Sequence, residues 1–194
     1  MADWLAGAGA LLALWNDVDP EVEAEYEDWH ANEHVPERLT VPGILDACRY
    51  AAMAPALRPR YLTLYALASA EVLDSSAYRH LLAHPTPASA RMRPHLRNVA
   101  RWVCRLHRTA PVWPEGPVHV RTSDDVVTMP AQMASPLLLA EHLPQAPGLP
   151  WMTSGQALKV EGRWLMVRES TPAPLADEED CCHPLPVRRA RIAH

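Results

Sequence analysis

The chain has 194 residues, of which 48% are hydrophobic and 21% charged, and a formal net charge of −5 at pH 7. These values are typical of one globular domain or two small ones, and they argue against a nucleic-acid-binding protein. No apolar run reaches the roughly 18 residues of a membrane helix, and the N-terminus lacks the basic residues of a secretory signal. We therefore expect a cytoplasmic protein without a membrane span, and the four irregularly spaced cysteines predict no disulfide framework.

The first predicted elements are a buried strand over residues 8–16 and a helix that begins at Asp19-Pro20. Aspartate can cap the free N–H groups of a helix, and proline suits the first helical position. Pro36 is expected to stop or kink the helix near His34, because its ring clashes with the carbonyl one turn back. One line of side chains at i,i+4 spacing runs along the helix: Tyr26, His30, His34 and Arg38.

The remainder of the first half predicts two strands, a helix and a third strand. Val41-Pro42-Gly43 reads as a turn, which the strands over 44–53 and 60–67 follow. A helix over 74–84, a loop over 86–94 and a strand over 98–107 complete the series. The order β-α-β-β-α-β is that of the ferredoxin-like unit, so the predicted fold class is α+β.

A second, fainter copy of this unit follows a Pro-rich linker. Glu141-His142-Leu143-Pro144 is similar to Glu33-His34-Val35-Pro36, and two further landmarks follow each in the same order: Pro147-Gly148-Leu149 for Pro42-Gly43-Ile44, and Arg163 to Val167 for Arg60 to Leu64. Chance matching of short apolar strings is the alternative explanation. The predicted domains are a first unit at 1–108, a linker at 109–117, a degenerate second unit at 118–170, and a Pro-rich acidic tail at 171–194. The tail is expected to be loosely held, with a closing strand at 187–193.

Taken together, several segments resemble the EthD-like branch of the dimeric α+β barrel superfamily: Glu27 to His30, Glu33 to Arg38, Val41-Pro42-Gly43, Arg49-Tyr50 and Arg60-Tyr61-Leu62. The resemblance covers residues 8–108 well and 118–169 faintly. It implies ferredoxin-like units whose sheets pair face to face into a barrel, either within one chain or between the chains of a homodimer. Members of the superfamily include cofactor-free isomerases, dehydratases and oxygenases, haem-binding enzymes, and proteins of unknown activity.

His34 is the first candidate for catalysis, because the His-x-Pro histidine of the family falls there and an imidazole titrates near neutral pH. The alternative is that His34 only caps the helix end. His30 lies one turn earlier, where it would orient His34 or line a pocket, unless it is a surface histidine. Arg49 and Tyr50 are candidates to bind a substrate anion, whereas Arg38 is expected to form a salt bridge to Glu33, Glu37 or Asp46. Trp15, Trp29, Tyr61 and Tyr65 are candidates for the wall of an apolar pocket, with plain core packing as the alternative for each.

The same helix also spells His-x-x-Glu-His at His30, Glu33 and His34, which is a zinc-peptidase pattern. Pro36 argues against a long ligand helix and the sequence offers no third ligand, so no metal site is predicted. Cys181-Cys182-His183 is read as part of the tail, since adjacent cysteines cannot easily chelate one ion together.

Three hypotheses remain for the function. The first is an enzyme that uses no cofactor and applies His34 as acid or base to a small aromatic or carbonyl substrate. The second is a haem-binding barrel enzyme. The third is a non-catalytic binding or assembly module with solid cores, against which an ordered pocket beside His34 would count.

Overall fold

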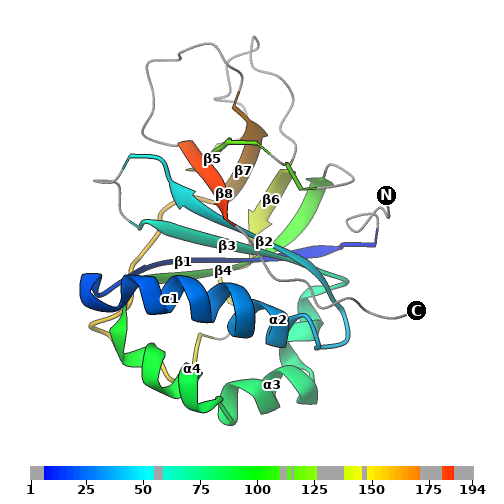
Figure 1. Cartoon of the computed structure of the whole chain (residues 1–194). Helices are drawn as coiled ribbons and strands as arrows, with labels where there is room; N and C mark the ends of the chain where they lie inside the picture. Colours follow the sequence, from blue (N-terminus) through cyan, green and yellow to red (C-terminus); the bar gives the residue numbers. More distant parts are fainter. Residues whose placement is uncertain are drawn as a thin grey trace.

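A computed structural model describes residues 7–54, 59–109, 113–114, 116–125, 138–145, 148–170 and 181–185. The strands form a closed antiparallel barrel in the order β1-β3-β2-β8-β5-β7-β6-β4 (Figure 1). Their bounds are β1 Ala10–Val18, β2 Ile44–Ala52, β3 Tyr61–Leu67, β4 Leu96–Thr109, β5 Val118–Ser123, β6 Leu138–His142, β7 Trp164–Glu169 and β8 Cys181–Leu185. The barrel therefore closes within one chain, which was one of the two arrangements expected.

The helices lie on one side of the barrel, over the sheet of β1 to β4 (Figure 1). Between β1 and β2 the chain forms η1 Pro20–Val22, α1 Glu23–Trp29, η2 His30–His34 and α2 Val35–Arg38. Between β3 and β4 it forms η3 Ala70–Asp74, α3 Ser76–Ala83, α4 Pro87–Met92 and η4 Arg93–His95. None of these helices has the length and apolar character that crossing a bilayer requires.

The helix that carries both histidines does not stop near His34, one of the two outcomes expected from Pro36, but continues through Pro36 to Arg38. Its middle turn, His30–His34, is a π-helix, and the N–H of Val35 bonds to the carbonyl of His30 five residues back. A π-helical turn widens the hydrogen-bonding spacing and accommodates an irregularity such as a proline. Pro36 then lies in the first turn of α2, where its missing N–H costs little.

The prediction of a loop over 86–94 is also wrong, because the segment contains α4 and η4. The Thr86 hydroxyl accepts a hydrogen bond of 3.1 Å from the N–H of Ser89, and Pro87 occupies the first turn. These are ordinary signals for a helix start. At only six residues, α4 is too short to show a clear apolar periodicity.

Two apolar layers account for the alternation of side chains along β1 to β4. One face of this sheet points into the barrel and packs against the strands of the second half, with Leu11, Leu64 and Trp102 meeting Val118, Leu138 and Leu165. The other face packs against the helices through Leu12, Tyr65, Leu67 and Val35. These described side chains thus form a packed core inside the barrel.

The end of the chain differs from its predicted form. Cys181–Leu185, inside the segment expected to be loosely held, is strand β8, which joins β2 to β5 and closes the barrel. The backbone groups of β8 are satisfied by both neighbours, which offsets its short length and its proline. The predicted strand at 187–193 lies outside the described residues.

One pair of the predicted repeat landmarks takes two different structures. Glu33-His34 is helical, whereas Glu141-His142 lies in β6. His142 stacks on Trp102 with ring centroids 4.2 Å apart, whereas His34 makes a tilted contact with Trp29 at 4.5 Å. His142 is therefore not equivalent to His34 in its surroundings. Among the described residues, β5 to β8 carry no covering helix.

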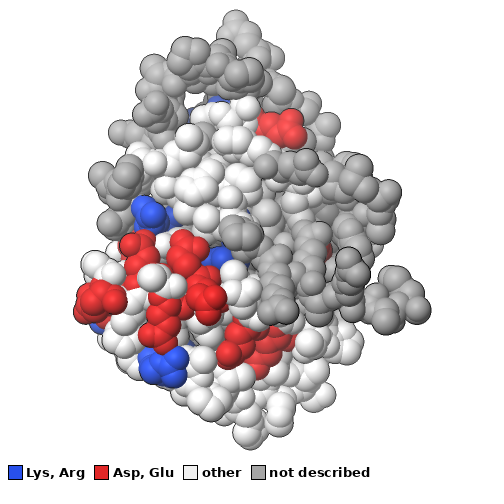
Figure 2. All heavy atoms as spheres, in the orientation of Figure 1, with Lys and Arg blue, Asp and Glu red and all other residues white. Residues whose placement is uncertain are grey.

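The exposed side of α1 is acidic (Figure 2). Several of its carboxylates pair with arginines from neighbouring elements: Glu25 with Arg91 at 2.5 Å, Glu23 with Arg60 at 2.9 Å, and Glu27 with Arg49 at 3.4 Å. Such a face repels the phosphates of a nucleic acid, and its exposed ion pairs contribute little to stability.

Candidate functional site

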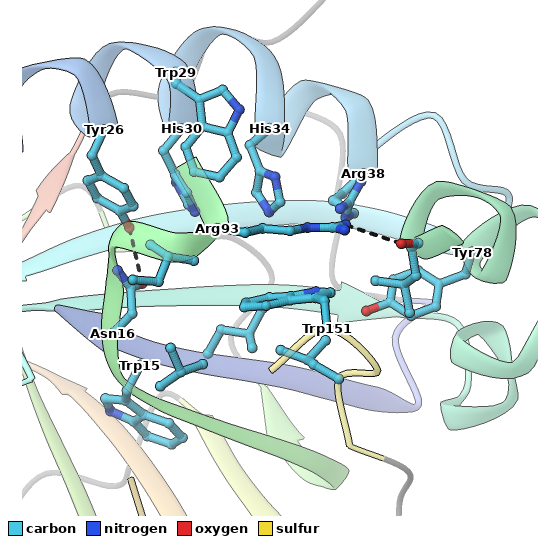
Figure 3. A pocket seen from close by; sticks show the side chains of 15 residues that line it. Trp15, Asn16, Tyr26, Trp29, His30, His34, Arg38, Tyr78, Arg93 and Trp151 are labelled. Atoms are coloured by element: carbon cyan, nitrogen blue, oxygen red, sulfur yellow. Dashed lines mark hydrogen bonds between the residues drawn. The ribbon is translucent and has the colours of Figure 1, made fainter. Parts of the chain in front are cut away.

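A cavity of about 50 Å³ lies between the helix layer and the ends of β1 and β4 (Figure 3). It has room for a few water molecules, well below the size of a typical ligand pocket. Its walls come from β1, the continuous helical segment α1-η2-α2, α3, η4, β4 and the segment that precedes β7. The lining residues are Leu14, Trp15, Asn16, Tyr26, Trp29, His30, His34, Arg38, Tyr78, Leu82, Arg93, Leu96, Val99, Leu149 and Trp151.

The line of side chains predicted along the helix faces this cavity (Figure 3). Tyr26, His30, His34 and Arg38 all belong to its lining. The rings of Tyr26 and His30 lie 5.1 Å apart, as do those of His30 and His34, and Trp29 packs 4.5 Å from His34. The Tyr26 hydroxyl donates a hydrogen bond of 3.1 Å to Asn16 Oδ1 on β1, which ties the helix to the sheet at one end of the cavity.

Both imidazoles are held in the neutral state. Burial, followed by the charges of Arg49 and Arg38, keeps the pKa of His30 well below its usual value. Burial and then the charge of Arg38 do the same to the pKa of His34. The Nδ1 atoms of both rings are buried and have no hydrogen-bond partner within the described part of the chain, and neither does Trp29 Nε1. A neutral imidazole keeps one of its two ring nitrogens without a proton and can accept a proton there.

Two guanidinium groups flank the imidazoles. Arg38 is 5% exposed and pairs with Glu37 at 2.7 Å, so the salt bridge expected for this residue is confirmed. Arg93 extends across the cavity between His34 and Trp151 (Figure 3). Burial, and then the nearby charge of Arg38, lowers the pKa of Arg93. A substrate that loses a proton to an imidazole here would leave its negative charge beside two cations.

The structure brings together some of the predicted site residues and separates others. His30, His34, Trp15 and Trp29 line the cavity. Four do not line it. Tyr50 faces the interior of the barrel, and Tyr65 lines an adjoining hollow of about 10 Å³. The Tyr61 hydroxyl donates a hydrogen bond of 2.7 Å to Glu23, and Arg49 pairs with Glu27. Alternation along β2 explains the position of Tyr50, because neighbouring residues point to opposite faces of the sheet. Arg49, Tyr61 and Tyr65 lie on the helix side of the sheet but contact other parts of the helix layer.

Several lining residues were not found from the sequence, among them Asn16, Arg93 and Trp151. Asn16 was visible only as a polar residue ending a buried strand. Arg93 lies within the segment predicted to be a loop. Trp151 comes from the second half of the chain, and no local pattern indicates that it would reach the helices of the first half.

The zinc-like spacing does not gather its three side chains around one point. The Glu33 carboxylate accepts a hydrogen bond from the Thr86 hydroxyl at the start of α4, while the two imidazoles face the cavity. Within the described ranges, no group of three His, Cys, Asp or Glu side chains is placed to hold a metal ion.

Acidification is expected to destabilise the protein through His30. The unfolded chain binds a proton on this imidazole below its ordinary pKa of 6.5, whereas the buried ring in the folded chain does not. The contribution of His30 to the free energy of unfolding is therefore fully present above pH 6.5. It is lost as the pH falls from 6.5 toward the pKa of His30 in the folded state, by at most about 1.4 kcal/mol per pH unit for one imidazole.

Urea unfolding of wild type and His30→Gln at about pH 7.5 and about pH 5.5 measures this loss. We expect a smaller loss in the variant, and the same substitution at the exposed His80 serves as the matched control. Equal losses in wild type and His30→Gln would contradict the prediction.

No protein-family model matches the chain, and no curated protein matches it either. The fold resembles a crystal structure described as that of an anthrone oxidase-like protein, with a TM-score of 0.54 and 10% sequence identity. The match covers 94% of this chain and 92% of the other, so it includes both halves of the barrel. At this identity the likeness concerns the fold alone.

Proposed function

We propose that the protein is an enzyme that removes a proton from a small aromatic or carbonyl substrate in the cavity beside His34, without a cofactor. The observation that carries this proposal is the pair of neutral imidazoles, each with an unpartnered buried Nδ1, facing a cavity lined by two arginines. The third hypothesis, a module with solid cores, stays an alternative, because a cavity of about 50 Å³ holds only a few water molecules.

The chemistry assigned to the site has two parts. His34, supported by His30, accepts the proton from an acidic C–H or O–H group. Arg38 and Arg93 stabilise the enolate or phenolate that remains. An anthrone suits this chemistry, because loss of a methylene proton gives a fully aromatic phenolate, but its three rings need more room than the cavity of about 50 Å³ offers. Dioxygen would then take electrons from this anion, so that the methylene group and O₂ become a carbonyl group and water.

The finer relationships belong to the same proposal. We infer kinship with the EthD-like branch from the helix with His-x-Pro and the hairpin that follows it. Descent of the two halves from one ferredoxin-like unit is supported by the element order of the first half, in which the strands lie side by side as β4-β1-β3-β2. A cytoplasmic homodimer remains the expected state, and size-exclusion chromatography with light scattering tests the dimer.

Anaerobic hydrogen exchange separates proton removal from oxidation. Anthrone in D₂O under nitrogen should lose its methylene proton signals faster with the protein than without it. In air, the protein should speed oxygen consumption and quinone formation above the uncatalysed background. Exchange without oxidation would favour an isomerase or dehydratase. Absence of both, with anthrone and a set of small phenolic ketones, would contradict the proposal.

Haem remains the alternative cofactor implied by the superfamily. The cavity of about 50 Å³ has no room for a porphyrin, so the residues as arranged do not fit it and no step is derived through it. A Soret band that saturates at one haem per chain on titration would overturn the cofactor-free proposal.

A further inference from the structure

Trp151 stands between the cavity and a larger hollow on the outside of the molecule. The outer hollow has a volume of about 400 Å³ and is lined by Arg79, Leu82, Ala83, Pro150 and Trp151. Leu82 and Trp151 also line the inner cavity, so these two side chains form the wall between the two spaces. The outer hollow has the size of a small-molecule pocket, whereas the inner cavity holds the imidazoles and is too small for a flat multi-ring ligand.

The indole of Trp151 packs against the guanidinium of Arg93 and against an apolar cluster that includes Met92, Leu96 and Val99. The guanidinium carbon of Arg93 lies 5.3 Å from the centre of the indole ring, and in Figure 3 the two groups lie against each other inside the cavity. A cation–π contact of this kind contributes about 0.5–2 kcal/mol. Arg93 Nη2 donates one further hydrogen bond, a long one of 3.3 Å, to the carbonyl oxygen of Leu82.

The segment that carries Trp151 is anchored farther along the chain. Gln156 Nε2 donates to the carbonyl oxygens of Arg93 at 2.9 Å and Leu96 at 3.0 Å, and the N–H of Val99 donates to the carbonyl of Gln156 at 2.7 Å. Displacement of the indole therefore leaves the base of this segment fixed to β4.

We infer that Trp151 is a movable partition within one ligand site, and that the ligand is a planar aromatic anion that replaces the indole on the guanidinium of Arg93. An aromatic ring substitutes for the stacking surface of the indole, and its anionic oxygen supplies a charge that the indole lacks. With the partition displaced, the inner and outer spaces form one site that runs from His34 to Arg79.

Charge at both ends of this site supports an anionic ligand. Arg79 is exposed at the rim of the outer hollow and has no ion pair among the described residues, while Arg93 lies at the inner end. The walls between them are apolar: Leu82, Ala83 and Pro150. This ligand class rests on the proposed function and deepens it, since a phenolate or an aromatic acid is the form such a base would produce or bind.

Chemical labelling of His34 tests the partition without any turnover. Diethyl pyrocarbonate acylates neutral imidazoles, and mass spectrometry of peptides gives the rate at each histidine. We expect Trp151→Ala to raise the labelling rate of His34 about tenfold or more, because the reagent then reaches the imidazole without prior displacement of an indole. Trp164→Ala is the matched control, since Trp164 also stacks with an arginine, Arg163 at 5.5 Å, on the outside of the barrel.

Circular dichroism confirms that each variant is folded, and Trp151→Val replaces Trp151→Ala if the alanine variant is not. An unchanged labelling rate at His34 in a folded Trp151 variant would overturn the inference. Because this measurement needs no reaction, it stands apart from the proposed function: faster labelling with no activity on any substrate would support the partition and contradict the enzymatic role.

The ligand class is tested by calorimetry with naphthoate and its uncharged counterpart, naphthalenemethanol. Naphthoate should bind wild type and slow the labelling of His34, and Trp151→Ala should bind it about tenfold more tightly. Arg93→Gln should lose about tenfold or more in affinity for naphthoate and little for the alcohol. Equal binding of the two compounds, or no binding of either by wild type and Trp151→Ala, would overturn the assignment of an aromatic anion.

Discussion

Replacement of His34 by alanine is expected to lower kcat/KM for the proton-removing reaction by about 10²- to 10⁴-fold, the usual contribution of a general base. The melting temperature should change little. His34 Nδ1 is buried without a hydrogen-bond partner in the described part of the chain, so the substitution breaks no polar contact at that atom. It also relieves the desolvation that keeps the pKa of this ring low.

His142→Ala is the control that separates this role from a general effect of losing a histidine. His142 also has a pKa lowered by burial, but it stacks on Trp102 and does not line the cavity. We expect this variant to keep its turnover. A drop of many degrees in the melting temperature of His34→Ala would make His34 a structural residue, and unchanged hydrogen exchange on anthrone would remove it from catalysis.

A third comparison divides the work between the two histidines. If His34 takes the proton and His30 supports it, His30→Gln should reduce kcat less than His34→Gln does, since the amide still fills the space beside Tyr26. The reverse order would make His30 the base. Both rings lie in the cavity wall, so the geometry alone permits either.

The candidate site was predictable as far as it depends on local periodicity. The i,i+4 spacing placed Tyr26, His30, His34 and Arg38 on one line, and all four line the cavity. Trp29 was included as well, and its ring lies 4.5 Å from His34. The four side chains still face the same cavity despite the π-helical turn, because the helix continues through Pro36 and does not end there.

Positions that depend on which face of a strand turns inward were harder to assign. In β2 and β3 nearly every residue is buried, since one face packs in the barrel and the other under the helices. A strand buried on both sides shows no alternation of polar and apolar residues, so the sequence could not tell that Tyr50 faces the barrel core and not the cavity. Burial of Arg49 was equally hidden, as its partner Glu27 is 22 positions earlier.

Features that depend on contacts between distant segments could not be derived at all. Trp151 reaches the cavity only because Gln156 fixes its segment to the start of β4, about 60 residues earlier. The strand β8 was missed for a similar reason. Cys181–Leu185 carries a proline and follows an acidic stretch, and it is a strand because β2 and β5 both offer it hydrogen bonds.

The packed interior of the barrel makes a second strong prediction, which concerns stability. Leu165 on β7 is fully buried in the core that β1 to β4 share with the second half. Leu165→Ala should lower the free energy of unfolding by about 2–5 kcal/mol, from the reduced burial and the cavity that remains. The unfolding should stay a single transition, because Leu11, Leu64 and Trp102 of the first half pack against the same cluster.

Urea unfolding followed by tryptophan fluorescence and by circular dichroism checks both parts of this prediction. Met53→Ala is the control, because its side chain is 52% exposed and its removal should cost about 0.5 kcal/mol or less. If the first half were a domain of its own, Leu165→Ala would split the unfolding into two transitions and leave the later one at the wild-type midpoint. That outcome would mean that the helices and β1 to β4, with the histidine cavity, do not need β5 to β8 for their stability. A joint loss instead would mean that the cavity, which already takes Trp151 from the second half, depends on the whole barrel.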